Sequence, residues 1–175
     1  MIDQDSEALR SRLLNFDRSG SSIDEDSARY QCHGIFAYPA MMVPRLQGVL
    51  MDELLVNRGP GAVIYDPFMG AATVLSESIS RGLEFYGTDI NPLALLCGEV
   101  KSDTFLYKPA VANLHRLRQA LGQRREGCLD IPFERLQKWF PKYVFDVLAR
   151  IRISIMSIED QWCRRIFWLA LAETV

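Results

Sequence analysis

The chain has 175 residues, 49% hydrophobic and 24% charged, which is ordinary for one globular domain with a core of its own. Its formal net charge of −2 gives no overall electrostatic indication of a nucleic-acid partner. The four cysteines are scattered, which argues against a zinc or disulfide framework. The polar N-terminus argues against a signal peptide, and the lack of a bilayer-long apolar run argues against a membrane partner. These features favour a cytoplasmic protein without a metal site.

The first 30 residues are polar and rich in serine and aspartate. We expect them to form a loosely ordered lead-in, apart from an apolar patch at Leu13 and Leu14 that could form a helix. The composition changes at Phe36, and residues 31–175 are expected to form one domain. Apolar residues at helical spacing predict an amphipathic helix over about residues 41–56.

Residues 60–101 predict the core of this domain. A β-branched apolar run at 62–65 is typical of a short, buried parallel strand, and a loop and a helix over 73–80 follow it. Residues 83–89 predict a second strand, and Pro92 suits the first turn of a helix that runs towards Lys101. The β-α-β-α order indicates an α/β fold with a parallel sheet.

Helical patterns dominate residues 103–175. Apolar residues three and four apart predict helices over 111–123, 142–157 and 162–173, with a break at 127–132. Trp139, Phe140 and Pro141 are expected to anchor the helix that starts near Lys142, with Trp139 in the core.

Both predicted strands end in an acidic residue. Asp66 begins the run Asp-Pro-Phe-Met-Gly-Ala-Ala-Thr, and Asp89 lies in Gly-Thr-Asp-Ile-Asn-Pro. The two aspartates are 23 residues apart, close to the roughly 20-residue offset between the glycine loop and the ribose-binding acid of a β-α-β unit. Small residues let a ligand approach the backbone, so the pattern indicates an adenosine-containing cofactor.

These two segments resemble the S-adenosylmethionine (SAM) site of amino-methylating DNA methyltransferases, whose loop has the form Asp-Pro-Phe-x-Gly-x-Gly-Thr. Residues 36–44 are similar to the motif that these enzymes place before the loop, in the order of the gamma type. The resemblance implies a Rossmann-like SAM-dependent methyltransferase fold, incomplete here and with a helical C-terminal portion. It also implies DNA methylation, as in restriction-modification.

The resemblance further implies which residues bind SAM. The loop with Asp66 and Gly70 would contact the methionine part, Asp89 would accept hydrogen bonds from both ribose hydroxyls, and Ile90 would lie against the adenine. Ala72 stands where the family usually has glycine, and its methyl group is expected to crowd the cofactor slightly. The implied cofactor-binding residues are Tyr38, Pro39, Ala40, Asp66, Pro67, Phe68, Met69, Gly70, Ala72, Thr73, Asp89, Ile90 and Asn91.

The family's catalytic motif, Asp/Asn/Ser-Pro-Pro-Tyr/Phe, has no counterpart, because the chain contains no Pro-Pro dipeptide. We therefore expect no catalytic residue here, and a chain that is either truncated or one half of a split enzyme and is inactive alone. DNA would be bound through the complete enzyme, which methylates adenine N6 or cytosine N4, with a complementary C-terminal catalytic fragment as a partner.

Two alternatives remain open. Transfer-RNA guanine-N2 methyltransferases share the Asp-Pro-Phe loop and the Gly-x-Asp-Ile acid, although the first 30 residues are too short for their RNA-binding domain. The other alternative is a non-catalytic, SAM-binding or structural subunit. His33 and His115 lack a carboxylate or cysteine cluster in sequence and are expected to be packed or surface residues, and the pairs Arg124–Arg125 and Arg164–Arg165 fit solvated faces better than phosphate contacts.

Overall fold

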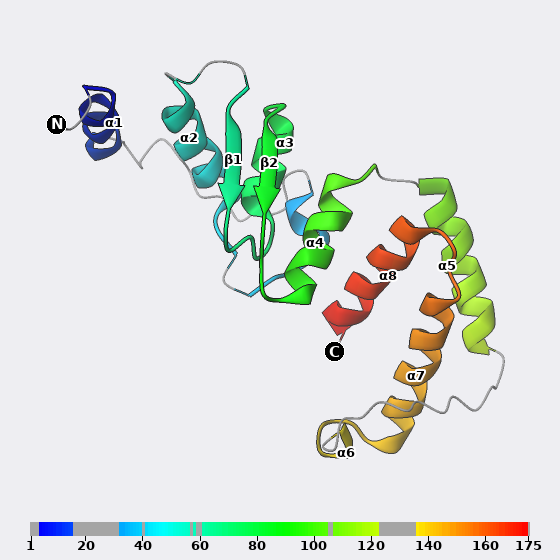
Figure 1. Cartoon of the computed structure of the whole chain (residues 1–175). Coiled ribbons are helices and arrows are strands. Elements are labelled where there is room, and N and C mark those ends of the chain that lie inside the picture. The colour runs from blue at the N-terminus through cyan, green and yellow to red at the C-terminus, as the bar shows by residue number, and fades with distance from the viewer. Residues whose placement is uncertain are drawn as a thin grey trace. The chain divides into compact units, whose positions relative to one another are not determined.

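The computed structural model describes residues 4–15, 32–39, 41–56, 58, 61–104, 107–122 and 136–174 (Figure 1). The chain divides into two compact units, Met1–Asp103 and Thr104–Val175. The first contains α1 (Gln4–Leu14), the 3-10 helix η3 (His33–Ile35), α2 (Pro44–Leu55), β1 (Val63–Asp66), α3 (Thr73–Ser80), β2 (Glu84–Gly87) and α4 (Pro92–Ser102). The second contains α5 (Tyr107–Gly122), α6 (Leu136–Trp139), α7 (Lys142–Met156) and α8 (Gln161–Thr174).

The two strands of the first unit pair in parallel. Val63 lies opposite Glu84 and Asp66 lies opposite Gly87, so both strands end at the same edge of the sheet. The order β1, α3, β2, α4 confirms the predicted β-α-β-α unit and its parallel pairing. This register places the loop after β1 next to the residues that follow β2.

One face of this sheet is more exposed than the sequence predicts. Ile64 and Phe85 are partly covered, and α3 packs against β2, but Val63, Tyr65 and Tyr86 are 53%, 62% and 57% exposed. The prediction of a buried first strand was therefore wrong for one face. Figure 1 shows β1 and β2 side by side, with α2, α3 and α4 around them.

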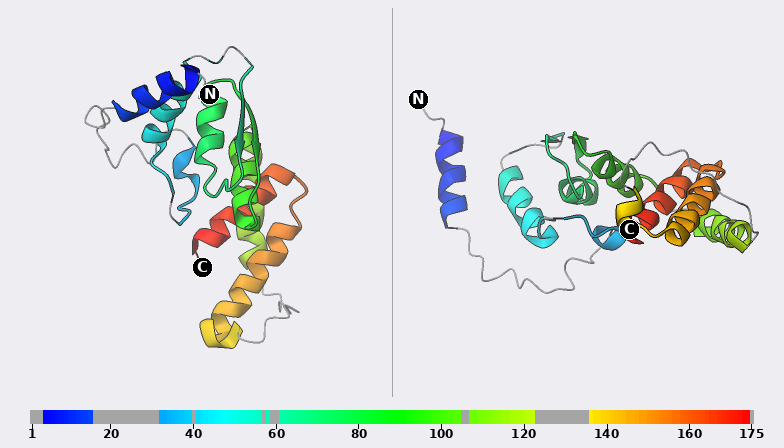
Figure 2. Two further views of the ribbon diagram at one scale, coloured as in Figure 1. Left: turned by 60° about the vertical axis from the view of Figure 1, so that its left-hand side comes forward. Right: turned by 90° about the horizontal axis from the view of Figure 1, so that it is seen from below.

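Within residues 1–30, which the sequence predicts as a lead-in, the structure describes the helix α1. This helix lies beside α2 in both views of Figure 2. Arg12 joins them, because its Nη2 donates to the Glu53 carbonyl oxygen at 3.0 Å and its Nε lies 3.6 Å from Glu53 Oε2. Residues 16–31 lie outside the described part of the chain.

The entry into α3 passes through an unusual backbone conformation. Ala72 has φ 57° and ψ 37°, the left-handed region, which costs an L-residue roughly 1–2 kcal/mol. Its side chain is fully buried in a cluster with Met69 and Leu75, against which Phe85 packs, and burial of a methyl-sized group offsets about 0.8 kcal/mol of that cost. The methyl group is 0% exposed, and the expectation that it crowds a cofactor stays a prediction.

The second unit is helical, as the sequence predicts. Helix α5 begins four residues before its predicted start, since Pro109 falls in the first turn, where proline needs no hydrogen-bond donor. The core of the second unit contains Ile158, Trp162 and Cys163. Partly buried residues that include Leu117 and Phe167 pack against them. Helix α7 starts directly after Pro141, as predicted.

The aromatic residue before α7 does not take its predicted place. Trp139 is 68% exposed, with the Lys138 ammonium nitrogen 5.8 Å from its ring centroid, so the prediction of a core position was wrong. At the start of the next helix, α8, Asp160 acts as the N-cap, because its Oδ1 accepts a hydrogen bond from the Cys163 amide at 2.6 Å.

Candidate functional site

The loop after β1 is held by its own polar groups. Asp66 Oδ1 accepts a hydrogen bond from the Phe68 amide at 3.0 Å, which closes a tight turn at the strand end. The Met69 amide donates to the Thr88 carbonyl oxygen at 3.0 Å and ties the loop to the residues after β2. Gly70 then adopts φ 49°, a conformation that glycine enters without steric strain.

Asp89 connects this loop to the end of β2. Its Oδ1 accepts from the Asn91 amide and its Oδ2 accepts from the Gly70 amide, both at 2.8 Å. These hydrogen bonds hold the pKa of the Asp89 carboxyl below its usual value, and the bond from the Asn91 amide has the largest effect. The group is therefore ionised at neutral pH. A carboxylate has about four acceptor positions, which leaves roughly half of them for a ligand.

The upstream motif reaches the same place. Asn91 Nδ2 donates a hydrogen bond to the Tyr38 hydroxyl oxygen at 2.9 Å. The Tyr38 ring also lies against Gly70, since a Cβ added there would be 3.6 Å from Tyr38 Cε1. Segments that lie 53 and 19 residues apart in the sequence therefore meet at four predicted site residues, Tyr38, Gly70, Asp89 and Asn91.

Several predicted site residues present apolar surface to solvent around this junction. Ile90, directly after Asp89, is completely exposed, and Phe68 is 83% exposed. Pro39 and Pro67 are exposed as well. Exposed apolar side chains next to an ionised carboxylate can contact a ligand that has both a flat apolar ring and hydroxyl groups.

Other predicted site residues have buried side chains. Met69, Ala72 and Thr73 are 6%, 0% and 1% exposed, so contact with a ligand would have to come from their backbone. Ala40 lies outside the described residues. Asp66 Oδ2 and Thr73 Oγ1 are buried without a hydrogen-bond partner among the described residues, at a cost of about 1–3 kcal/mol each. Unpaired polar atoms of this kind fit a loop that receives a polar ligand or water.

A buried polar cluster lies next to the loop after β1, and the sequence did not predict it. Lys101 Nζ donates to the Ala71 carbonyl oxygen at 2.6 Å, and Cys32 Sγ donates to Ser76 Oγ at 3.2 Å. Burial lowers the pKa of the Lys101 ammonium, because the charged form is poorly solvated there. The signal in the sequence is weak: a lysine in the last turn of a helix whose other residues are mostly apolar.

His33 belongs to this cluster. It is fully buried, which confirms the packed alternative, and its Nε2 lies 3.0 Å from Glu77 Oε1, a carboxylate 44 residues away in the sequence. Glu77 also accepts a hydrogen bond from Arg81 Nη1 at 2.6 Å, and Arg81 pairs with Asp52. His115, by contrast, is exposed on α5.

The stability of the first unit is expected to fall as the pH drops below about 6.5. Burial lowers the pKa of His33 more than its hydrogen bond to Glu77 raises it. The unfolded chain therefore binds a proton near pH 6.5 that the folded chain does not bind, and the free energy of unfolding decreases as the pH falls from there towards the folded pKa. Urea unfolding followed by circular dichroism between pH 8 and 5 measures this slope.

His33→Gln removes the titrating group and keeps an amide donor for Glu77, so its stability should change less between pH 6.5 and 5. The carboxyls of Asp52 and Asp89, whose pKa values are lowered by hydrogen bonds from Arg81 and from the backbone amide of Asn91, titrate below this window. Equal slopes in the two proteins would contradict the assignment to His33.

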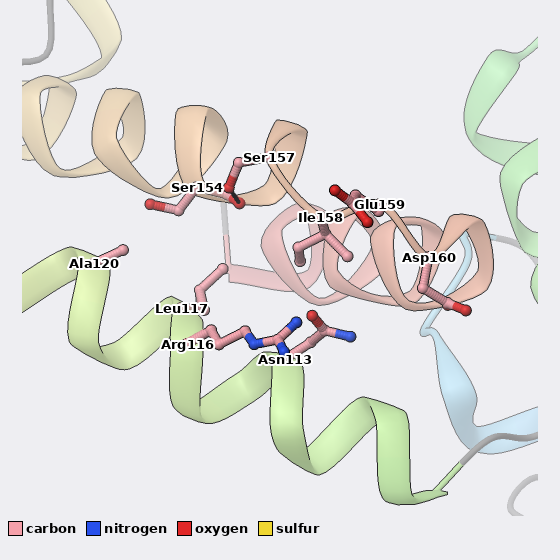
Figure 3. Close-up of a pocket in the computed structure, with 9 residues that line it drawn as sticks. All are labelled: Asn113, Arg116, Leu117, Ala120, Ser154, Ser157, Ile158, Glu159 and Asp160. Carbon is pink, nitrogen blue, oxygen red and sulfur yellow. Dashed lines mark hydrogen bonds between the residues drawn. The ribbon is translucent and has the colours of Figure 1, made fainter.

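The second unit contains a cavity of about 460 Å³ between α5 and the end of α7 (Figure 3). Arg116 and Asn113 point into it from α5, towards Glu159 and Asp160 in the connection between α7 and α8. Its lining combines both signs of charge and includes none of the predicted site residues. We therefore place the candidate site at the loop after β1.

Two further types of site find no support in the part of the chain that the structure describes. It contains no group of three or more histidine, cysteine, aspartate or glutamate residues that could hold a metal ion. None of the described helices is both long and apolar enough to span a bilayer.

Comparison with known proteins gives two relatives. The chain is 32% identical over 151 residues to the type II methyltransferase M.MvaI of Kocuria varians, an alignment that covers 82% of the chain and 33% of that protein. It is 31% identical over 88 residues to the type II methyltransferase M.MjaII of Methanocaldococcus jannaschii, covering 50% of the chain and 16% of that protein. The chain thus spans about a third or less of the length of these relatives. No family model and no solved structure matches it.

Proposed function

Because the chain belongs to the family of type II DNA methyltransferases, we propose that it is the SAM-binding portion of an enzyme that methylates an exocyclic amine of adenine or cytosine. The observation that supports this most directly is the junction of Tyr38, Gly70, Asp89 and Asn91, where three predicted motifs meet. The two-stranded parallel sheet would then be part of a Rossmann-like fold.

The chemistry of the junction fits SAM. The ribose hydroxyls would donate to the free acceptor positions of the Asp89 carboxylate, and the adenine would lie against the exposed Ile90. The glycine at position 70 leaves the loop backbone open to the methionine part of the cofactor. Bound SAM would supply a methyl group on a sulfonium, and the role of these residues would be to hold and orient it.

This proposal gives the chain binding residues and no catalytic residue. The target amine would meet the sulfonium in the complete enzyme, which also binds DNA. The transfer-RNA alternative is not favoured, because both relatives are type II methyltransferases. A non-catalytic subunit would use the same cofactor junction and would differ only in what accompanies it.

The proposal is tested by titrating SAM into the 175-residue chain in a calorimeter. We expect saturable binding at micromolar concentration, and binding of S-adenosylhomocysteine, which has the same ribose and adenine. ATP serves as the control, because the junction offers an anionic carboxylate and no cationic side chain to a triphosphate. A folded chain that binds neither SAM nor S-adenosylhomocysteine at millimolar concentration would overturn the proposal.

A further inference from the structure

The net charge of the chain conceals a strong segregation between its two units. Residues 1–103 contain eight Lys and Arg and 15 Asp and Glu, a formal charge of −7. Residues 104–175 contain 12 Lys and Arg and seven Asp and Glu, a formal charge of +5. The helical unit is therefore basic, although the chain as a whole is slightly acidic.

Helix α5 carries part of this charge. It contains three Lys and Arg residues and no Asp or Glu. Lys108, His115 and Arg118 are exposed and lie seven and three residues apart, a spacing that aligns them along one side of a helix. Ala110 and Leu117 lie on the side that packs against the core of the unit.

Lys108 and Arg118 have no local counter-charge. Lys108 and Arg118 form no ion pair or hydrogen bond with any other residue that the structure describes. An exposed helix usually balances its cations with acids three or four residues away, and α5 has none to offer. The positive potential of this side is therefore uncompensated by its own helix.

We propose that the side of α5 formed by Lys108, His115 and Arg118, named the α5 basic stripe, contacts the phosphate backbone of duplex DNA. The stripe extends over ten residues, about 15 Å at 1.5 Å per residue, which is long enough for Lys108 and Arg118 to contact two different phosphates of the duplex backbone. The choice of DNA among polyanions rests on the proposed function, because a DNA methyltransferase has to bind DNA. The first unit is acidic, so we expect the phosphate contact in the basic second unit.

Arg116 provides a matched control on the same helix. It differs from Arg118 in its surroundings, because it lines the cavity that Glu159 and Asp160 also line (Figure 3). Arg45, exposed on α2, provides a second control in the acidic unit. Each control changes the charge of the protein by the same amount as one substitution in the stripe.

The test measures binding of a fluorescent 20-base-pair duplex to the full chain by anisotropy between 50 and 200 mM salt. Wild type should bind with a steep salt dependence. The double variant Lys108→Gln with Arg118→Gln should reduce the slope of log K against log salt by about 2, since each lost phosphate contact removes about 0.9. Arg116→Gln and Arg45→Gln should change the slope by less than half of the single Arg118→Gln effect.

Three results would overturn this inference: no binding of the duplex at 50 mM salt, an equal effect of Arg116→Gln and Arg118→Gln, or equal or tighter binding of duplex RNA or of phosphatidylserine vesicles. All substituted side chains are exposed, and unchanged thermal unfolding would show that the variants fold. The SAM titration distinguishes the two proposals, because SAM binding does not involve the α5 basic stripe. Loss of one activity with retention of the other identifies which proposal fails.

Discussion

Asp89→Ala is expected to weaken SAM binding by at least about 100-fold, because it removes the ionised acceptor for both ribose hydroxyls. The same change also removes the acceptor of the Gly70 and Asn91 amides, so the loop loses its bond to the end of β2. The dissociation constant is measured by calorimetry with the wild-type chain as the reference. A variant that is folded and binds SAM within a few-fold of wild type would exclude Asp89 as the ribose ligand.

Two further variants separate the ribose contact from the effect on the loop. Asp89→Asn keeps one oxygen that can accept from the Gly70 amide but loses the negative charge, so its loss of affinity should be smaller than that of alanine and still clear. Glu84→Gln removes a negative charge from an exposed carboxylate on β2 that accepts a hydrogen bond from the Tyr86 hydroxyl. It should leave SAM binding unchanged, whereas a comparable loss would indicate a general effect of charge.

The local elements of this fold could be predicted because their signals are local. Pro92 in the first turn and Asn91 before it mark the start of α4, where the Asn91 side chain accepts from the Leu93 amide at 3.0 Å. The helix over 73–80 follows from its apolar spacing and a glycine exit. The site motifs were found in the same way, from residues that are close in sequence.

The parts that failed depend on contacts across the sequence. The contact of His33 with Glu77 spans 44 residues and therefore has no periodic signature. The exposed face of β1 was missed because an apolar run does not tell which of its two faces receives a neighbour. Trp139 was misplaced for the same reason, since hydrophobicity alone does not fix a residue in a core.

Net charge is uninformative for a related reason. A total of −2 gives no overall electrostatic indication of a nucleic-acid partner, but the units carry −7 and +5, and the total conceals both. The sequence predicts a change to helical patterns at residue 103, and the structure places the boundary between two compact units there. Electrostatic inference from a sequence thus depends on knowing which residues form one body.

Glu77→Ala is expected to lower the free energy of unfolding of the first unit by about 3 kcal/mol, because removing one partner of a buried polar or ionic contact leaves the other unpaired. Glu77 is 7% exposed and accepts hydrogen bonds from His33 and Arg81 through its two carboxylate oxygens. His33 would be left in the core with neither ring nitrogen paired, since its Nδ1 already has no partner among the described residues. Urea unfolding followed by circular dichroism measures the change.

Asp52→Ala is the matched control, because Asp52 pairs with the same Arg81 but its side chain is 61% exposed. Water solvates the Asp52 carboxylate, and Arg81 keeps its hydrogen bond to Glu77, so this substitution should cost less than about 1 kcal/mol. All three tryptophans lie in the second unit, and their fluorescence gives an internal reference for unfolding that the two substitutions should leave in place. Equal losses for Glu77→Ala and Asp52→Ala would show that burial of the His33–Glu77 contact does not stabilise the support of the loop. In that case, the position of Asp89 relative to Gly70 would have to depend on Lys101 and the hydrogen bonds of the loop itself.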